Sequence, residues 1–230
     1  MTLSNKQNIK CPQCGHESEF EFYKSINTMI NPELKERVCN GDIFKFTCPN
    51  CGEETIVAYP FLYHMMEAQT MIYLVGEDSV EDTAKIINKS KDLKIDEVNV
   101  LSEIDYRIRI VTSVKDLLEK IDILEDKYDD KAIELIKVLS ELNLVEANTD
   151  IEYDDIVYVN DFNKGKAIVF INGGKPVYAV EISEELYKEH MKIAKLLKTD
   201  EDESYTIDRN WAFEQLEEFV SNSKDAMDQQ

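Results

Sequence analysis

Alternation of acidic and aromatic side chains near the front of the chain predicts β-structure. Within residues 18–23, Phe20 and Phe22 share one face while acidic residues take the other, which is the two-residue period of a half-buried strand. Further runs rich in aromatic and β-branched residues also favour strands. These further predicted strands are residues 43–47, 55–59, 69–75 and 106–111. We therefore expect strands to dominate the first half of the chain.

Apolar residues spaced three and four apart predict two consecutive helices after these strands. Ser113 can cap the first helix, with Asp116 placed to reach back. Asp129 and Asp130 suit the start of the second, because carboxylates are stabilised at the positive end of a helix. The apolar stripes are Val114, Leu117, Leu118, Ile121 and Leu124 in the first helix, and Ala132, Leu135, Ile136, Leu139 and Leu142 in the second. The charged stretch 79–92, which precedes both, predicts a surface helix.

The last third of the chain predicts a small α/β unit. Asn172-Gly173-Gly174 is a hairpin-turn signal between two runs that favour strands. Ser183 and Asp208 precede amphipathic stretches and are predicted to begin two helices. The strands predicted here are residues 156–159, 167–171 and 177–182. The whole pattern predicts an α+β protein in three parts, residues 1–75, 76–145 and 146–230.

Two copies of a Cys-Pro-x-Cys-Gly motif carry the clearest chemistry in the sequence. Two residues between the cysteines let both sulfurs of a tight turn face one ion, while proline and glycine supply the backbone angles of the turn. Four sulfurs then complete the tetrahedral shell that is typical of structural Zn²⁺. The motifs are Cys11-Pro12-Gln13-Cys14-Gly15 and Cys48-Pro49-Asn50-Cys51-Gly52. We therefore predict a zinc site at Cys11, Cys14, Cys48 and Cys51.

The same four-sulfur shell also suits iron, as in rubredoxin-type electron carriers, and the sequence leaves this alternative open. A catalytic zinc needs an open coordination position, which four cysteines do not leave. The pattern therefore favours a structural metal over a catalytic one. Cys39, the fifth cysteine, falls at the end of a predicted helix, where we expect an inert thiol.

The segment between the two motifs is long enough to fold by itself. Between Cys14 and Cys48 lie 33 residues, from Gly15 to Thr47, against the ~15–20 of a minimal ribbon. Asn31 can cap a helix, Pro32 suits the first helical position, and Gly41 can end the helix. We expect a strand, a short helix and a returning strand, so the front of the chain is predicted to be a zinc ribbon with an inserted helix and an extended sheet.

Several further segments, before and after the second motif, follow the order in which they occur in one protein family. They are Ser25-Ile26-Asn27, Asn31-Pro32-Glu33-Leu34-Lys35-Glu36, Phe46-Thr47-Cys48-Pro49, Tyr59-Pro60-Phe61-Leu62-Tyr63-His64, Met71-Ile72-Tyr73, Arg109-Ile110-Val111-Thr112-Ser113 and Leu118-Glu119-Lys120-Ile121. With them the chain resembles the CpXC domain family, bacterial and archaeal proteins with no assigned biochemical function. The resemblance covers about residues 9–145. It implies a metal-binding domain of unknown activity, and the four motif cysteines are the only functional residues it carries over.

The net charge and the amino-terminal sequence bear on which kinds of molecule the protein binds and on where in the cell it is expected. The chain holds 47 acidic and 26 basic residues, for a net charge of −21. Nucleic acids and anionic membranes are polyanionic, so neither is an expected partner. The first ten residues lack the apolar core of a signal peptide. We expect a cytoplasmic protein with reduced cysteines, and a protein partner of unknown identity.

Histidines supply the other candidate chemistry. His64, with Glu67 close in sequence, could be a general base, and an enzyme would then use Tyr59–His64 as one wall of a pocket. A packed, hydrogen-bonded histidine is the favoured interpretation of His64. His16 is expected to be exposed, and His190 to lie at the core boundary. A non-enzymatic binding or scaffold protein with structural zinc is the favoured function; an enzyme of unknown reaction and an iron electron carrier are the alternatives.

Overall fold

The computed structural model describes residues 2–91, 106–163, 165–197 and 204–228, with the backbone alone given for residues 91 and 223–228. The protein has the predicted α+β fold. The chain divides into two compact units, Met1–Leu118 and Glu119–Gln230. The boundary between them falls within helix α3 (Val114–Glu125). The division into three parts stays a prediction.

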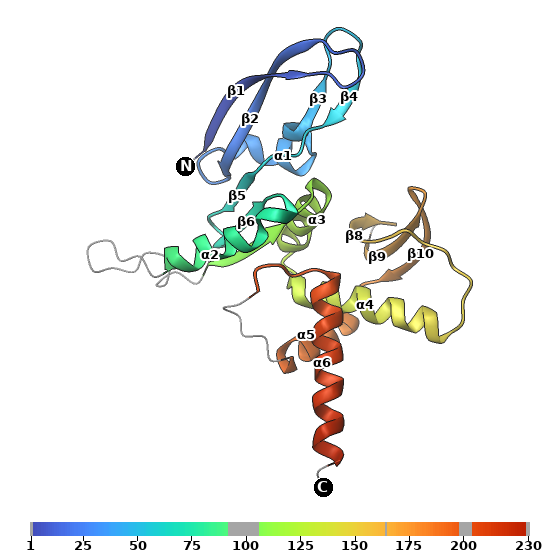
Figure 1. Ribbon diagram of the computed structural model, residues 1–230. Helices are drawn as coiled ribbons and strands as arrows, with labels where there is room; N and C mark the ends of the chain where they lie inside the picture. Colours follow the sequence, from blue (N-terminus) through green and yellow to red (C-terminus); the bar gives the residue numbers. More distant parts are fainter. Residues whose placement is uncertain (1, 92–105, 164, 198–203, 229–230) are drawn as a thin grey trace. The chain divides into compact units, whose positions relative to one another are not determined.

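A five-stranded sheet in the order β1-β2-β5-β6-β7 forms the frame of the first unit (Figure 1). β2 pairs in parallel with β5, and β6 with β7, while the other neighbours are antiparallel. A separate two-stranded sheet pairs β3 with β4. The strands are β1 (Leu3–Lys10), β2 (Glu17–Asn27), β3 (Lys45–Thr47), β4 (Glu54–Ile56), β5 (Phe61–Met65), β6 (Thr70–Leu74) and β7 (Arg107–Val111). The helices are α1 (Glu33–Cys39), α2 (Val80–Lys91) and the 3-10 turns η1 (Asp42–Phe44) and η2 (Glu77–Ser79).

The strand, helix and strand predicted between the two cysteine motifs are present as β2, α1 and β3. Asn31 was wrongly predicted to cap the helix: α1 begins at Glu33, and the Asn31 amide donates to the Glu33 carboxylate instead (2.7 Å). Ile43 and Phe44 were wrongly predicted as strand. Gly41 ends the helix with a left-handed turn (φ 73°), and the chain re-enters through η1 before β3 starts.

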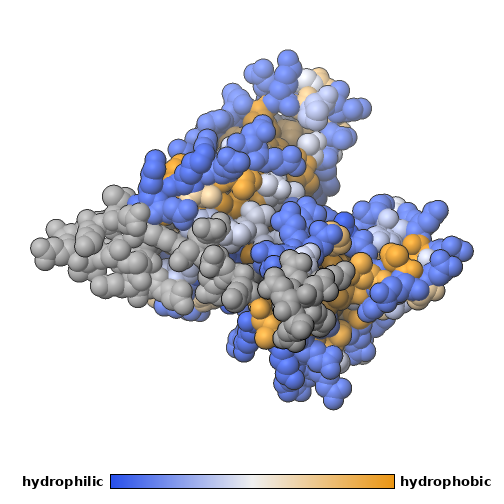
Figure 2. Space-filling view, turned by 60° about the horizontal axis from the view of Figure 1, so that its bottom comes forward, coloured by the Kyte–Doolittle hydropathy of each residue, from blue (hydrophilic) through white to orange (hydrophobic). Residues whose placement is uncertain are grey.

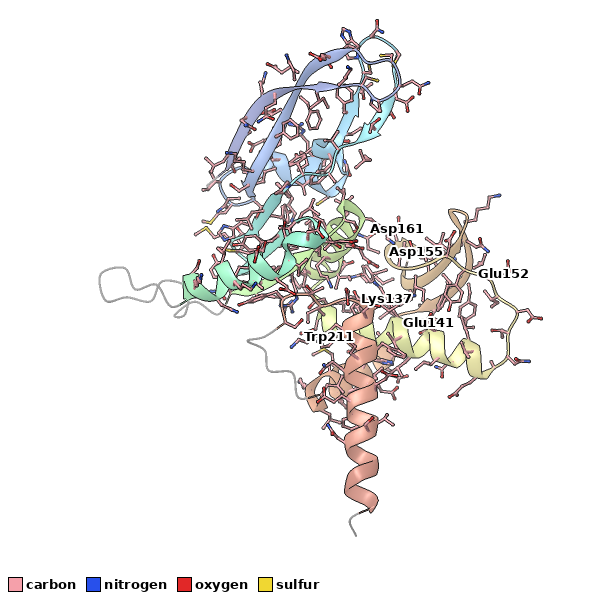
Figure 3. All side chains as sticks on the ribbon, viewed as in Figure 1. Lys137, Glu141, Glu152, Asp155, Asp161 and Trp211 are labelled. Carbon is pink, nitrogen blue, oxygen red and sulfur yellow. The ribbon has the colours of Figure 1, made fainter. Side chains whose placement is uncertain are left out.

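The second unit pairs one antiparallel sheet, in the order β10-β9-β8, with a group of helices. The hairpin predicted at Asn172-Gly173-Gly174 joins β9 to β10, and both glycines have positive φ. The elements are α4 (Asp130–Glu146), β8 (Asp155–Phe162), β9 (Gly165–Asn172), β10 (Lys175–Glu181), α5 (Glu184–Leu196) and α6 (Arg209–Asp228). In Figure 3, Lys137 lies on α4 and Trp211 near the start of α6.

Helix caps predicted from the sequence are confirmed as hydrogen bonds. The Ser113 hydroxyl accepts from the Asp116 N–H (3.0 Å) and donates to the Asp116 carboxylate (2.6 Å). Asp129 accepts from the Lys131 N–H at the start of α4. The two remaining caps are Ser183 with the Leu186 N–H and Asp208 with the Trp211 N–H. Side chains that satisfy the first free N–H groups fix where each helix begins.

A buried charge network, which the sequence pattern did not predict, links α3 to α4 within the second unit. Lys120 contacts Asp130 (3.2 Å) and Glu134 (3.5 Å), and all three side chains are at most 5% exposed. Lys137 completes it with contacts to Glu134 (3.1 Å) and Glu119 (2.8 Å). Each buried charge has an opposite charge beside it, which is the condition for burying it at all.

Replacing Lys120 with methionine tests this network. The variant keeps much of the side-chain stem but removes the cation that contacts both Asp130 and Glu134, so we expect a loss of about 3–5 kcal/mol in the free energy of unfolding. Lys188→Met is the matched control, because Lys188 forms an exposed pair with Glu184 and should change stability by less than about 1 kcal/mol. Urea denaturation measures both, and equal effects would contradict the assignment.

Candidate metal centre

Each cysteine motif folds into the same tight turn. In the first, the Cys11 N–H donates to the His16 carbonyl and the Gly15 N–H to the Cys11 carbonyl, both at 2.9 Å. The second turn repeats the two bonds as Cys48 N–H to Glu53 carbonyl (2.8 Å) and Gly52 N–H to Cys48 carbonyl (2.9 Å). Gly15 and Gly52 have φ values of 72° and 76°, a region that glycine adopts without strain. The two turns are therefore structurally equivalent halves of one site.

The two turns bring all four predicted sulfurs together. The Sγ atoms of Cys11 and Cys51 lie 3.7 Å apart, and those of Cys14 and Cys48 lie 3.6 Å apart. All four sulfurs fall within 4.8 Å of one another. A tetrahedral shell with metal–sulfur bonds of about 2.3 Å has sulfur–sulfur edges of roughly 3.8 Å. The four cysteines can therefore hold one metal ion, as the sequence predicts.

The site has an inner and an outer side. Cys11 and Cys48 are each 1% exposed and belong to a buried cluster with Phe20 and Phe46. Cys14 and Cys51 are exposed, and the Asn50 amide donates to the Cys14 sulfur (3.6 Å). The first cysteine of each motif therefore lies in the core, and the second lies at the surface.

The thiols do not ionise alike. A backbone hydrogen bond at His16, followed by the Asn50 amide, lowers the pKa of Cys14 to about 6. At Cys51 a backbone hydrogen bond at Glu53 also lowers the pKa, but burial and the neighbouring thiols outweigh it and raise the pKa to about 12. Four thiolates this close repel one another. The full tetrathiolate therefore requires a cation at its centre, and binding that cation releases protons.

An aromatic layer lies beneath the inner sulfurs and joins the two hairpins that carry the motifs. Phe20 of β2 packs edge-on against Phe46 of β3, with ring centroids 6.0 Å apart. Tyr59 packs against Phe22 and Phe44 (5.1 and 5.2 Å). Burial raises the pKa of Tyr59 to about 12, so its hydroxyl stays protonated and donates to the Ile43 carbonyl (3.0 Å). The sequence pattern indicated strands here but not this shared layer.

The remaining predicted residues lie outside the cluster. Cys39 is half-buried at the end of α1 and is not among the grouped sulfurs. His16 is exposed, as expected, and serves the site through its backbone. His190 is buried and bonds through Nδ1 to the Leu186 carbonyl (2.7 Å), also as expected.

His64 and the segment before it are engaged in packing and hydrogen bonds within the first unit. Phe61 and Tyr63 point into the core, at 3% and 0% exposure. Both ring nitrogens of His64 are engaged by neutral groups, Nδ1 by the Asn27 amide (3.2 Å) and Nε2 by the Tyr106 hydroxyl (2.9 Å). His64 is therefore the packed, hydrogen-bonded histidine that the sequence favoured, and Asn27 and Tyr106 are partners that sequence reasoning missed.

The first unit is thus a domain of mixed strands and helices in which two equivalent tight turns gather four cysteine sulfurs that could hold a metal ion. A family model described as "CpXC protein" matches residues 9–137, more than half of the chain, and this chain belongs to that family. No curated protein and no solved structure matched it. Among the described residues, no helix has the length and apolar character needed to cross a membrane.

Substitution of one inner cysteine tests the metal centre. Cys48→Ser removes a buried ligand, so the purified variant should hold far less than the roughly one metal ion per chain expected of the native protein. Cys39→Ser is the matched control and should keep the native metal content, because Cys39 lies outside the cluster. Elemental analysis measures both. Full metal content in Cys48→Ser, or its loss in Cys39→Ser, would contradict the assignment of ligands.

Proposed function

We propose that this protein is a non-enzymatic binding or scaffold module of the cytoplasm, whose first unit is held in shape by structural Zn²⁺. The observation that carries the proposal is the sulfur geometry, with edges of 3.6 and 3.7 Å between sulfurs of different turns. Zinc favours this tetrahedral shell, and four thiolates leave no position for water or substrate. Zn²⁺ bound in this way stabilises the fold and takes no part in a reaction.

The position of the metal supports a structural role. The ion would tie the turn of the β1–β2 hairpin to the turn of the β3–β4 hairpin, and β3 and β4 are only three residues long each. A pair of such short strands has little stability of its own. The metal and the aromatic layer together account for how these short strands are held.

The cytoplasm fits the chemistry of the site, because closely spaced thiols remain reduced and available to metal there. The charge of −21 favours a partner with cationic groups over nucleic acids or anionic lipids. Among the coloured residues of the face drawn in Figure 2, hydrophilic ones predominate, with smaller hydrophobic areas among them. The proposed partner is another protein, which meets this acidic surface with basic side chains.

Iron electron transfer is the second candidate, because a tetrahedral four-sulfur shell suits either metal. Two of the sulfurs, Cys14 and Cys51, are exposed, so an electron could reach such an iron from outside. Elemental analysis with a visible absorption spectrum separates the two proposals: colourless zinc protein supports the structural role, and a red iron protein replaces it with redox chemistry.

Chelation of the native protein tests the structural role of the metal. Removing the ion leaves four thiols without their cation, so amide protection in residues 2–91 should fall to near that of an unfolded chain. The second unit has its own core, and protection in residues 130–197 should persist. Hydrogen exchange read by mass spectrometry measures both regions in one sample. Unchanged protection in residues 2–91 after complete metal removal would refute the proposal, and readdition of Zn²⁺ provides the control for reversibility.

A further inference from the structure

The side chain of Asn27 holds the turn that follows β2. Asn27 is the last residue of that strand and is 2% exposed. Its carbonyl oxygen Oδ1 accepts from the backbone N–H groups of Met29 (3.0 Å) and Ile30 (3.3 Å). Its backbone carbonyl accepts from the Asn31 N–H (2.9 Å). Because Oδ1 must face these two donors, the amide orientation of Asn27 is fixed, and Nδ2 points the other way.

His64 receives that amide. His64 lies opposite Asn27 in the parallel β2–β5 pair, and Nδ2 of Asn27 donates to Nδ1 of His64 (3.2 Å). Since Nδ1 accepts, the single ring proton of neutral His64 is on Nε2, which donates to the Tyr106 hydroxyl (2.9 Å). The hydrogen bonds therefore select one tautomer, in which Nδ1 carries no proton.

Protonation of His64 conflicts with this arrangement. A proton on Nδ1 would face the N–H₂ group of Asn27, so two donors would oppose each other without an acceptor. Rotating the amide would satisfy the ring, but it would turn N–H₂ toward the Met29 and Ile30 N–H groups and break both turn bonds. We propose that Asn27 and His64 form an acid-sensitive latch, which holds the turn at Met29 and Ile30 while His64 is neutral and releases it when His64 is protonated.

The groups around the ring favour the neutral form. Burial lowers the pKa of His64 below its ordinary value of 6.5. Strand β6, whose Met71 pairs with His64, has no charged side chain. Glu67 and Arg107, which are close in sequence to His64 and Tyr106, are not among the groups that shift the pKa of His64. No carboxylate among the described groups favours the protonated ring.

The direction of the pH effect follows from this lowered pKa. Above about pH 6.5 His64 is neutral whether the latch is closed or open, and its stabilising effect is fully present. As the pH falls below that value, the open form binds the proton first. The closed latch is therefore lost progressively down to the lower pKa that His64 has in the folded state.

The turn that the latch holds is exposed at the surface. Met29 and Ile30 are 59% and 60% exposed, and Met66, whose sulfur also contacts the Asn27 amide (3.7 Å), is 43% exposed. The latch would therefore set whether these apolar side chains are presented in one fixed arrangement. None of the latch residues is a metal ligand, so this inference does not depend on which metal the cysteines hold or on the proposed binding function.

Nuclear magnetic resonance on the full-length, metal-loaded protein tests the latch. The His64 ring should titrate below pH 6.5, and protection of the Met29 and Ile30 amides, corrected for intrinsic exchange, should fall roughly three- to tenfold over the same pH range. In His64→Gln the new carbonyl can accept from Asn27 but cannot titrate, so this protection should stay constant. His190→Gln, which removes a buried histidine in the second unit, should respond like the native protein.

Two outcomes overturn the proposal. One is native protection at Met29 and Ile30 that stays constant between about pH 7.5 and about pH 5 while His64 titrates. The other is a folded His64→Gln variant that loses protection at the same pH as the native protein. If His64→Gln does not fold, the native sample decides, since the ring titration and the amide protection must then share one midpoint.

Discussion

The meeting of four sulfurs from two turns far apart in sequence is the constraint on which the first unit depends. Cys14 and Cys48 are separated by 33 residues, yet sulfurs of the two turns approach to 3.6 and 3.7 Å. Thiolates at such distances repel one another, and a cation reverses the sign of that interaction. Everything between the motifs, including β2, α1 and β3, must then be arranged so that both turns reach the same point. The metal is thus the proposed source of order for the shortest strands of the protein.

The two units solve the problem of stability differently. In the first, the sulfurs of Cys11 and Cys48 pack in one buried cluster with the rings of Phe20 and Phe46. In the second, apolar clusters enclose a network of paired charges centred on Lys120 and Lys137. Paired charges cost more to break than they contribute to stability, and they tolerate few alternative packings. Loss of metal should therefore affect the units unequally.

Local signals in the sequence predicted most elements and the four cysteines whose sulfurs lie together, because these signals act over a few residues. Periodicity located the strands and helices, capping residues such as Asp129 and Ser183 located helix starts, and the repeated Cys-Pro-x-Cys-Gly motif named the site. Contacts between distant residues could not be predicted in this way. Asn27 and His64 are 37 positions apart, and the charges buried on α4 interrupt the apolar stripe that predicted that helix. The turn at Ile43 and Phe44 was missed because strand-forming side chains there fill a core position on a 3-10 turn.

X-ray absorption at the metal edge of the native protein addresses the central claim most directly, since it reports the ligands around the ion itself. The account predicts zinc with four sulfur neighbours at about 2.3 Å and no nitrogen or oxygen in the first shell. A shell containing nitrogen or oxygen, or fewer than four sulfurs, would contradict a closed tetrathiolate site and with it the structural role assigned to the metal.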